Sequence, residues 1–306
     1  MNVHPHLRHS LLACALLLAS GSTWAAQPGL LTKELQQARS YTVSSAPIAP
    51  LQLDPPKLPD LSGYTAQAVQ QKIDRSQPGK VSLRRMFQED SLKAFVGGDN
   101  KAAEWVRRQH GIPQAIFIDD GHVDLAQLSR QVPRQYLSEV QPGVYLARLP
   151  IVVGRTGTLE IDGKVKQLRL SEEGGAFLVN DGKLFITDTQ VTGWREQAKG
   201  PATFRSPQAF RPFLLSWGGT ETYIVNSTLA SLGYAKSKSY GVSISQYTPN
   251  LAKRMGRAEP TGWIIGSQFS DLWYGFYCYE TRDFVVKDNT YRDNIVYGID
   301  PHDRSH

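Results

Sequence analysis

The last ten residues, YGIDPHDRSH from Tyr297 to His306, place a phenol, carboxylates, imidazoles and a guanidinium around a single proline. An imidazole beside a carboxylate can take up and return a proton near neutral pH, which is the chemistry of general acid–base catalysis. Because side chains alternate across a strand, Asp300 and His302 would share one face, while Pro301 and Asp303 point to the other.

Tyr297 has the opposite parity to Asp300 and His302. It would join them only where the backbone departs from regular alternation, and Gly298 or Pro301 could cause such a departure. The alternative is a solvated turn, because Asp-Pro and His-Asp are ordinary turn pairs. The ten residues by themselves leave both interpretations open, so the choice depends on the elements that position them.

Short runs of β-type residues follow one another from Ile112 onward. They are QAIFID, GVYLARLPIVV, TLEIDG, KQLRLS, GAFLVN and KLFITDTQVTGW, each bounded by Gly, Asp or Asn. Strand follows strand without an intervening helix. This order excludes a doubly wound α/β sheet and leaves a sandwich, a barrel or a solenoid.

An aromatic residue followed by glycine recurs toward the end of the chain. The pairs are Trp217-Gly218, Tyr240-Gly241, Tyr274-Gly275 and Tyr297-Gly298, so the first and third steps between glycines are equal and the second is longer. The longer step contains YTPNLAKRMGRAEPTG, which we interpret as a loop inserted into one repeat. A fixed period made of short strands and turns predicts a parallel β-helix, whose coils stack and bury a continuous apolar column. The same repeat would include three apolar pairs, each followed within a few residues by Ser or Asn: Ile224-Val225, Ile264-Ile265 and Val285-Val286.

Composition along the chain predicts four segments. Residues 1–26 are typical of a cleaved export signal, since Arg8 precedes an apolar run and small residues follow it. Residues 27–80 are rich in Pro, Ser, Ala and Gln and predict an extended arm or linker. Residues 81–111 have apolar residues at helical spacing and predict a helical cap, and residues 112–306 predict the β-helix. The chain stops just after a full repeat without a second cap, so we expect it to be part of a longer protein.

Charge and cysteine usage narrow the class of protein. The 34 Lys and Arg residues exceed the 28 Asp and Glu residues, which suits a polyanionic partner such as an acidic polysaccharide. Without the signal, Cys278 is the only cysteine, so no intramolecular disulfide can form and a small buried residue is expected there. We expect no membrane span after the signal, because no later run approaches about 20 apolar residues. We also expect no metal or cofactor, because no Cys/His spacing typical of a metal site occurs.

The string KDNTYRDNIVYGIDPHDRSH resembles the catalytic repeat of the alginate (mannuronan) C5-epimerases. Their signature, Tyr-Gly-Ile/Phe-Asp-Pro-His-Asp/Glu, is matched at all seven positions from Tyr297 to Asp303. The resemblance extends along the whole chain and is specific to the periplasmic branch. It implies a right-handed parallel β-helix, a periplasmic location and conversion of β-D-mannuronate to α-L-guluronate within polymeric alginate. That reaction removes the C5 proton and returns one to the opposite face.

The resemblance also implies roles for individual residues. His302 would be the base that takes the C5 proton, and Asp300 would orient its imidazole or contact the sugar. Tyr297 would lie close to the reacting carbon, and Asp303 would give structural support. The reaction places negative charge on a carboxylate, so a cation is needed there. Arg304 is an adjacent candidate, but the family's neutralising arginine is expected in a coil beyond residue 306, so this chain alone would lack it.

The polymer must also be held along the solenoid. Candidates for a basic groove that binds uronate carboxylates are Arg282, Lys287 and Arg292 in the preceding coil, with Lys253, Arg254 and Arg257 in the inserted loop. Candidates for stacking on sugar rings are Tyr274, Tyr277 and Tyr279. Each cation is more often a solvated surface charge, and each tyrosine is as readily a core residue.

Two other functions remain open at this point. A polyuronate lyase would remove the same C5 proton and then eliminate the 4-O-linked chain. A non-catalytic protein would shield the nascent polymer within a periplasmic export complex. The residues alone do not separate these functions from epimerisation.

Overall fold

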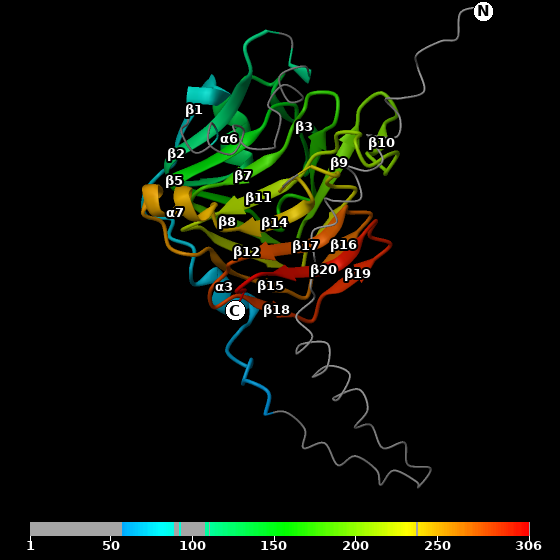
Figure 1. Cartoon of the computed structure of the whole chain (residues 1–306). Coiled ribbons are helices and arrows are strands. Elements are labelled where there is room, and N and C mark those ends of the chain that lie inside the picture. Colours follow the sequence, from blue (N-terminus) through cyan, green and yellow to red (C-terminus); the bar gives the residue numbers. More distant parts are fainter. Residues whose placement is uncertain (1–56, 89–91, 93–107, 110, 237, 306) are drawn as a thin grey trace, which may run out of the picture. The chain divides into compact units, whose positions relative to one another are not determined.

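The computed structural model describes residues 57–88, 92, 108–109, 111–236 and 238–305 (Figure 1). The chain forms two compact units, Met1–Pro59 and Asp60–His306. Nearly all of the first unit, including the expected export signal, lies outside the described residues. The described helices and strands all belong to the second unit.

Short parallel strands stack into three walls. The first wall holds β7 (Leu178–Asn180), β11 (Leu214–Trp217), β14 (Gly241–Ser245), β17 (Tyr274–Tyr279) and β20 (Tyr297–His302). The second holds β8 (Lys183–Thr187), β12 (Glu221–Val225), β15 (Thr261–Ile265) and β18 (Val285–Lys287). The third holds β4 (Val144–Ala147), β6 (Gln167–Ser171), β9 (Gln190–Arg195), β13 (Thr228–Ala230), β16 (Gln268–Ser270) and β19 (Thr290–Arg292). Successive coils visit the walls in turn, so the predicted parallel β-helix is confirmed.

Longer and antiparallel strands begin the solenoid. The strands β2 (Gln114–Asp124) and β5 (Ile151–Ile161) pair in parallel, and β5 continues into both the first and the second wall. Three strands pair antiparallel with strands of the solenoid: β1 (Lys80–Arg85) with β2, β3 (Leu137–Gln141) with β4 and, further along the chain, β10 (Gly200–Pro201) with β9.

The core is a column of apolar side chains inside the walls. Ile151, Leu178, Leu214 and Val242 lie opposite one another in four successive strands, and each is fully buried. Burying a side chain of this size stabilises the fold by about 1.5–3 kcal/mol. Cys278 also lies in this core, as predicted.

The turns between the second and third walls share one backbone conformation. Asp188, Asn226, Gly266 and Asp288 each have a φ between 48° and 59°. Asn, Asp and Gly adopt this left-handed conformation most readily, so these residues turn the chain within a single position. Polar side chains inside the turns bond to the next coil; the Ser267 amide, for example, donates to Asn289 Oδ1 at 2.8 Å. The Ser and Asn residues of the predicted repeat therefore form a ladder of hydrogen bonds between successive coils.

The aromatic–glycine repeat is confirmed for three of its four members. The rings of Tyr240, Tyr274 and Tyr297 stack in succession, with centroids 4.8 and 5.4 Å apart. The Trp217-Gly218 pair does not belong to this stack. Trp217 pairs with Ser245 at the other end of β14, and its indole donates to Asp181 Oδ1 at 2.6 Å. Its apparently regular spacing from Tyr240 was a coincidence, because the coils differ in length.

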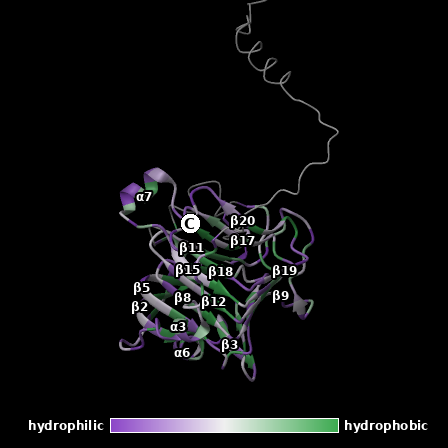
Figure 2. Cartoon of the chain, turned by 90° about the horizontal axis from the view of Figure 1, so that it is seen from below, coloured by the Kyte–Doolittle hydropathy of each residue, from purple (hydrophilic) through white to green (hydrophobic). Residues whose placement is uncertain are grey.

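A second apolar layer covers the outside of the first wall. Phe177, Phe213 and Trp217 lie in it, and helix α7 (Pro249–Met255) packs Leu251 and Met255 against it. Helix α7 otherwise projects from the strands with a largely hydrophilic surface (Figure 2). This helix is part of the predicted inserted loop.

The expected arm and helical cap need correction where they are described. Residues 60–80 belong to the compact unit, and helix α3 (Ala66–Gln70) packs Val69 on the outside of the second wall beside Phe185 and Tyr223. Residues 80–85 form β1 and not a helix, because Val81 and Leu83 alternate toward the core with period two. A 3₁₀ turn, Met86–Gln88, follows, and most of the remaining predicted cap lies outside the described residues. Helix α6 (Leu125–Gln131), which was not predicted, buries Leu125 and Leu128 in the main core.

Candidate active site

The sequence YGIDPH forms strand β20, which pairs in parallel with β17 (Figure 1). Pro301 lies opposite Cys278, which points into the core, and therefore faces inward. Asp300 lies opposite Tyr277 and His302 opposite Tyr279, so both candidate residues face outward. The imidazole of His302 lies 6.0 and 6.3 Å from the rings of Tyr277 and Tyr279, centroid to centroid. The solvated turn is thereby excluded, and alternation along one strand places the carboxylate and the imidazole together.

Tyr297 reaches the same side through a β-bulge. Gly241 pairs with Tyr274, but Ser243 pairs with Tyr277, so β17 carries one extra residue against β14. Strand β20 keeps the register of β17, with Tyr274 opposite Tyr297. The extra residue breaks alternation, and the Tyr274 ring lies 6.1 Å from that of Tyr277. Tyr297, stacked on Tyr274, therefore lies on the outer face with Asp300 and His302, as the sequence allowed.

The glycine of the Tyr274-Gly275 pair is needed for this close stacking. A Cβ at Gly275 would collide with the carbonyl oxygen of Gly298 in the next coil. Any larger residue would force the two strands apart at the bulge, so the glycine preserves the stack of tyrosine rings.

Tyrosine rings form the floor on which Asp300 and His302 stand. Tyr240 and Tyr277 lie 5.1 Å apart, which connects the stacked tyrosines to the face of β17. Burial raises the pKa of Tyr274 above its ordinary value, and the neighbouring Tyr240 and Asp300 raise it further. Burial likewise raises the pKa of Tyr277. Both phenols therefore remain protonated at neutral pH and are available as hydrogen-bond donors.

Lys238 is a member of this face that the sequence did not reveal. Its Nζ donates to the Tyr277 hydroxyl at 3.3 Å and lies 4.5 Å from the centre of the Tyr279 ring. Lys238 precedes the Tyr240-Gly241 pair by two positions in the loop KSKSYG. Its position just before a tyrosine–glycine pair was the signal that the sequence offered. The loop lies two coils before His302, however, so only the fold brings Lys238 and His302 onto one face.

The predicted basic groove is not assembled from the preceding coil. Arg282 lies after β17 and pairs with Glu259, with Nη2 3.3 Å from Oε2. Lys287 ends β18 on the second wall, where its Nζ donates to the Leu61 carbonyl at 3.4 Å. Arg292 lies in β19 on the third wall. The three cations thus occupy different parts of the coil and share no face with His302.

Two further predicted cations are held by carboxylates. Arg304 forms an ion pair with Glu280 just past the end of β20, where Asp303 and Arg304 both have positive φ angles. The strand ends at His302, so alternation does not place Arg304 on the face of Asp300 and His302. Arg257 pairs with the buried Asp181, while Lys253 and Arg254 are exposed on α7.

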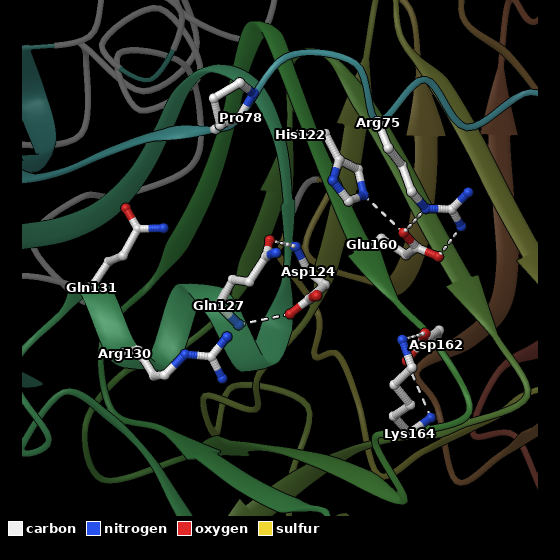
Figure 3. Close-up of a pocket in the computed structure, with 11 residues that line it drawn as sticks. Arg75, Pro78, His122, Asp124, Gln127, Arg130, Gln131, Glu160, Asp162 and Lys164 are labelled. Carbon is white, nitrogen blue, oxygen red and sulfur yellow. Dashed lines mark hydrogen bonds and ion pairs between the residues drawn. The ribbon is translucent and has the colours of Figure 1, made fainter.

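A separate polar pocket lies against β2, β5 and α6 (Figure 3). Glu160 binds His122 there, with Oε2 2.7 Å from Nε2, and also accepts hydrogen bonds from the Arg75 guanidinium. Burial raises the pKa of Glu160, but the bonds from His122 and Arg75 outweigh this effect and lower it to about 2. Both carboxylate oxygens are occupied, so we interpret this cluster as a tie between residues 75–79 and the first coils.

The structure also bears on metal sites and on membrane-spanning helices. Among the described residues, no group of three His, Cys, Asp or Glu side chains could hold a metal ion. Within the same residues, no helix is long and apolar enough to cross a membrane.

Comparisons with known proteins find several similar relatives. The chain is 82% identical over 306 residues to the mannuronan C5-epimerase of Pseudomonas putida KT2440, and 57% identical over 319 residues of alignment to that of Pseudomonas aeruginosa. It is 55% identical over 312 residues to mannuronan C5-epimerase AlgG of Azotobacter vinelandii. These alignments cover 99–100% of the chain but only 58–59% of the relatives.

The fold is also that of a solved relative. A crystal structure described as the periplasmic alginate epimerase AlgG superposes with a TM-score of 0.81 at 64% identity, covering 83% of this chain and 60% of that one. A scan against models of protein families finds no match. Similarity along the whole of this chain to several epimerases, together with the shared solenoid, nevertheless establishes the relationship. The chain belongs to the mannuronan C5-epimerase family, and it spans about 59% of the length of the relatives it matches.

Proposed function

We propose that the protein containing this chain converts β-D-mannuronate to α-L-guluronate residues within polymeric alginate. The observation that carries the proposal is the outer face of β20, where Asp300 and His302 stand side by side and the bulge adds Tyr297. The relatives' names supply the substrate, and the face supplies the groups that the reaction needs. A proton donor and acceptor must reach C5, and polar groups must reach the carboxylate.

His302 is the base in this proposal. Its exposed imidazole accepts the C5 proton, and the electron pair left behind delocalises into the sugar carboxylate. Asp300 lies on the same face of the same strand, and it orients the imidazole or contacts the sugar. Tyr297 or a water molecule returns a proton to the opposite face of C5. Pro301 lies between Asp300 and His302, and its fixed φ limits the freedom of the backbone that carries them.

Incubation of the protein that contains this chain with polymannuronate tests which reaction it catalyses. Growth of guluronate signals in the proton spectrum, without ultraviolet-absorbing unsaturated ends, is the expected result. Unsaturated ends without guluronate would instead identify a lyase and overturn the proposal. A protein without either product that still binds the polymer would fit the shielding role.

The variant His302→Asn tests the assignment of the base. We expect it to lose epimerisation while keeping the circular dichroism spectrum and the affinity for polymannuronate, because the imidazole is exposed. Turnover by His302→Asn within threefold of the parent would remove His302 from the mechanism.

The location and partners are proposed on the same basis. The solved relative is described as periplasmic, and the sequence predicts an export signal over residues 1–26. We propose a periplasmic location with alginate as the polyanionic partner. Association with other proteins of a polysaccharide export complex is a further proposal, which co-purification from periplasmic extracts would test.

A further inference from the structure

Lys238 is a cation on the candidate active face that forms no ion pair with a carboxylate of the described residues. Its Nζ donates to the Tyr277 hydroxyl and lies over the rings of Tyr277 and Tyr279, 4.9 and 4.5 Å from their centres. Within the part of the chain that the structure describes, no carboxylate forms an ion pair with it. The acid that acts on it from nearby is Glu280, which is already paired with Arg304.

The groups around Lys238 come from two neighbouring strands. Strand β17 contributes Tyr277 and Tyr279, and Glu280 follows it. Strand β20 contributes Asp300, opposite Tyr277, and His302, opposite Tyr279. The ammonium and the imidazole therefore flank the same ring: Nζ lies 4.5 Å and the imidazole 6.3 Å from the centre of Tyr279. Their separation cannot exceed the sum of these two distances, so one polymer chain can contact both groups.

Burial makes this charge costly in the absence of a ligand. It lowers the pKa of the Lys238 ammonium to about 8, and the charge of Glu280 opposes part of that effect. A partly desolvated cation that has only a phenol oxygen and aromatic faces as partners gains free energy when an anion binds. The structure thus offers a place for a carboxylate beside the candidate catalytic strand.

We propose that Lys238 is a substrate-positioning residue, whose ammonium binds the carboxylate of a uronate residue next to the one that reacts at His302. The proposal rests on the function proposed above. Every residue of a polyuronate carries a carboxylate, so a fixed cation a short distance from the base sets the register of the polymer. A sugar bound in that register presents its neighbour's C5 proton to His302.

Steady-state kinetics of Lys238→Met and Lys238→Arg in the protein that contains this chain test the proposal. Loss of one charge-assisted contact should raise KM for polymannuronate about tenfold in Lys238→Met. We expect kcat to stay within about threefold, because Lys238 does not touch the reacting carbon. The matched control is Lys199→Met, which removes an exposed lysine from the turn after β9 and should leave both constants unchanged.

The pH profile provides a readout that a purely structural lysine would not change. The cation binds a carboxylate only when protonated, so kcat/KM should fall as pH rises through about 8. Lys238→Arg should keep most of the affinity and move this alkaline limb to higher pH, because the guanidinium does not titrate there. Lys238→Met should lack the limb.

Three results would overturn the proposal. An unchanged KM and alkaline limb in Lys238→Met would show that Lys238 only packs on the tyrosines. A fall in kcat without a change in KM would place it in the chemical step. If Lys238→Met unfolds, Lys238→Arg with an unshifted alkaline limb would be equally decisive.

Binding measurements distinguish a failure of the proposed carboxylate site from a failure of the proposed reaction. Calorimetry with oligomannuronate at pH 7 and pH 9 needs no turnover. If the protein binds at pH 7 in a Lys238-dependent way but forms no guluronate, the proposed function fails and the carboxylate site stands. If oligomannuronate binds equally to the parent and to both variants, the site fails whatever the reaction is.

Discussion

Asp300 and His302 illustrate how much chemistry a single strand can position. They stand two positions apart, so the pleat alone turns both outward, and Pro301 between them faces the core. The pairing of β20 with β17 then fixes the strand, so these two side chains need no further element to bring them together. This part of the candidate site could be predicted from the sequence, because alternation is a local property.

The variant Asp300→Asn tests whether the carboxylate acts through the imidazole. If Asp300 orients His302 and stabilises its protonated form, the amide should lower kcat by about 10²–10³ with little change in KM. Both constants are measured from proton NMR spectra of polymannuronate reactions that are quenched at successive times. A raised KM with unchanged kcat would show instead that Asp300 only binds the sugar.

Glu160 gives a prediction about pH and stability. Its pKa is about 2 in the folded protein and about 4.5 in the unfolded chain, so the unfolded state binds more protons below pH 4.5. The stabilisation is therefore complete above pH 4.5 and is lost as pH falls toward 2, by up to about 3 kcal/mol. Chemical unfolding between pH 6 and pH 2.5 measures this loss.

The matched variants for that experiment are Glu160→Gln and Glu139→Gln. The first removes the titrating group, so its free energy of unfolding should depend less on acid pH than that of the parent. Glu139 is exposed and accepts a hydrogen bond from the Gly143 amide, which the glutamine oxygen can also accept, so its replacement should change the acid dependence less than Glu160→Gln does. If the free energy of unfolding depends equally on acid pH in all three proteins, the hydrogen bonds of Glu160 with Arg75 and His122 do not stabilise the folded protein in this pH-dependent way.

At the scale of elements, close contact between coils depends on backbone positions without side chains. Gly262 in β15 is such a position, because a Cβ there would collide with the carbonyl oxygen of Thr222 in β12. At Gly200 in β10 the nearest atom would lie 3.7 Å from an added Cβ, an ordinary contact. The two glycines thus form a matched pair for testing how tightly the walls stack.

We expect Gly262→Ala to lower the free energy of unfolding by more than about 2 kcal/mol, because neither backbone can move without breaking the ladder. Gly200→Ala should change it by less than about 1 kcal/mol. Denaturant unfolding of both variants measures the difference. Similar stabilities for the two would show that β12 and β15 can separate at little cost.

At the scale of the whole described unit, the solenoid is covered from outside by segments distant in sequence. Residues 60–76 pack on the second wall, and α7 and the 3₁₀ turn that follows β1 cover the first. Val69 is fully buried between α3 and the wall, whereas Gln67 in the same helix is exposed. Such coverings protect apolar outer faces that a bare β-helix would present to water.

Val69→Asp should therefore release this covering, while Gln67→Asp should not. A buried unpaired carboxylate on this wall should cost about 3 kcal/mol or more of stability. Limited proteolysis should cleave Val69→Asp within residues 60–76 much faster than the parent protein, and thermal unfolding should follow the same order. If both variants resist protease equally, residues 60–76 do not depend on Val69 for their docking.

The sequence by itself determined the class of fold, the strand that carries the candidate catalytic residues and the face they share. These depend on local periodicity, on turn residues and on a seven-residue motif, all of which are readable along the chain. Only the tertiary structure decided which residues of different coils meet. Coil lengths vary, so the step along the chain from Glu221 to its partner Thr261 is much longer than the step from Trp263 to its partner Val285. Because each insertion shifts the register of all that follows, the sequence could neither exclude Trp217 from the tyrosine stack nor bring Lys238 to His302.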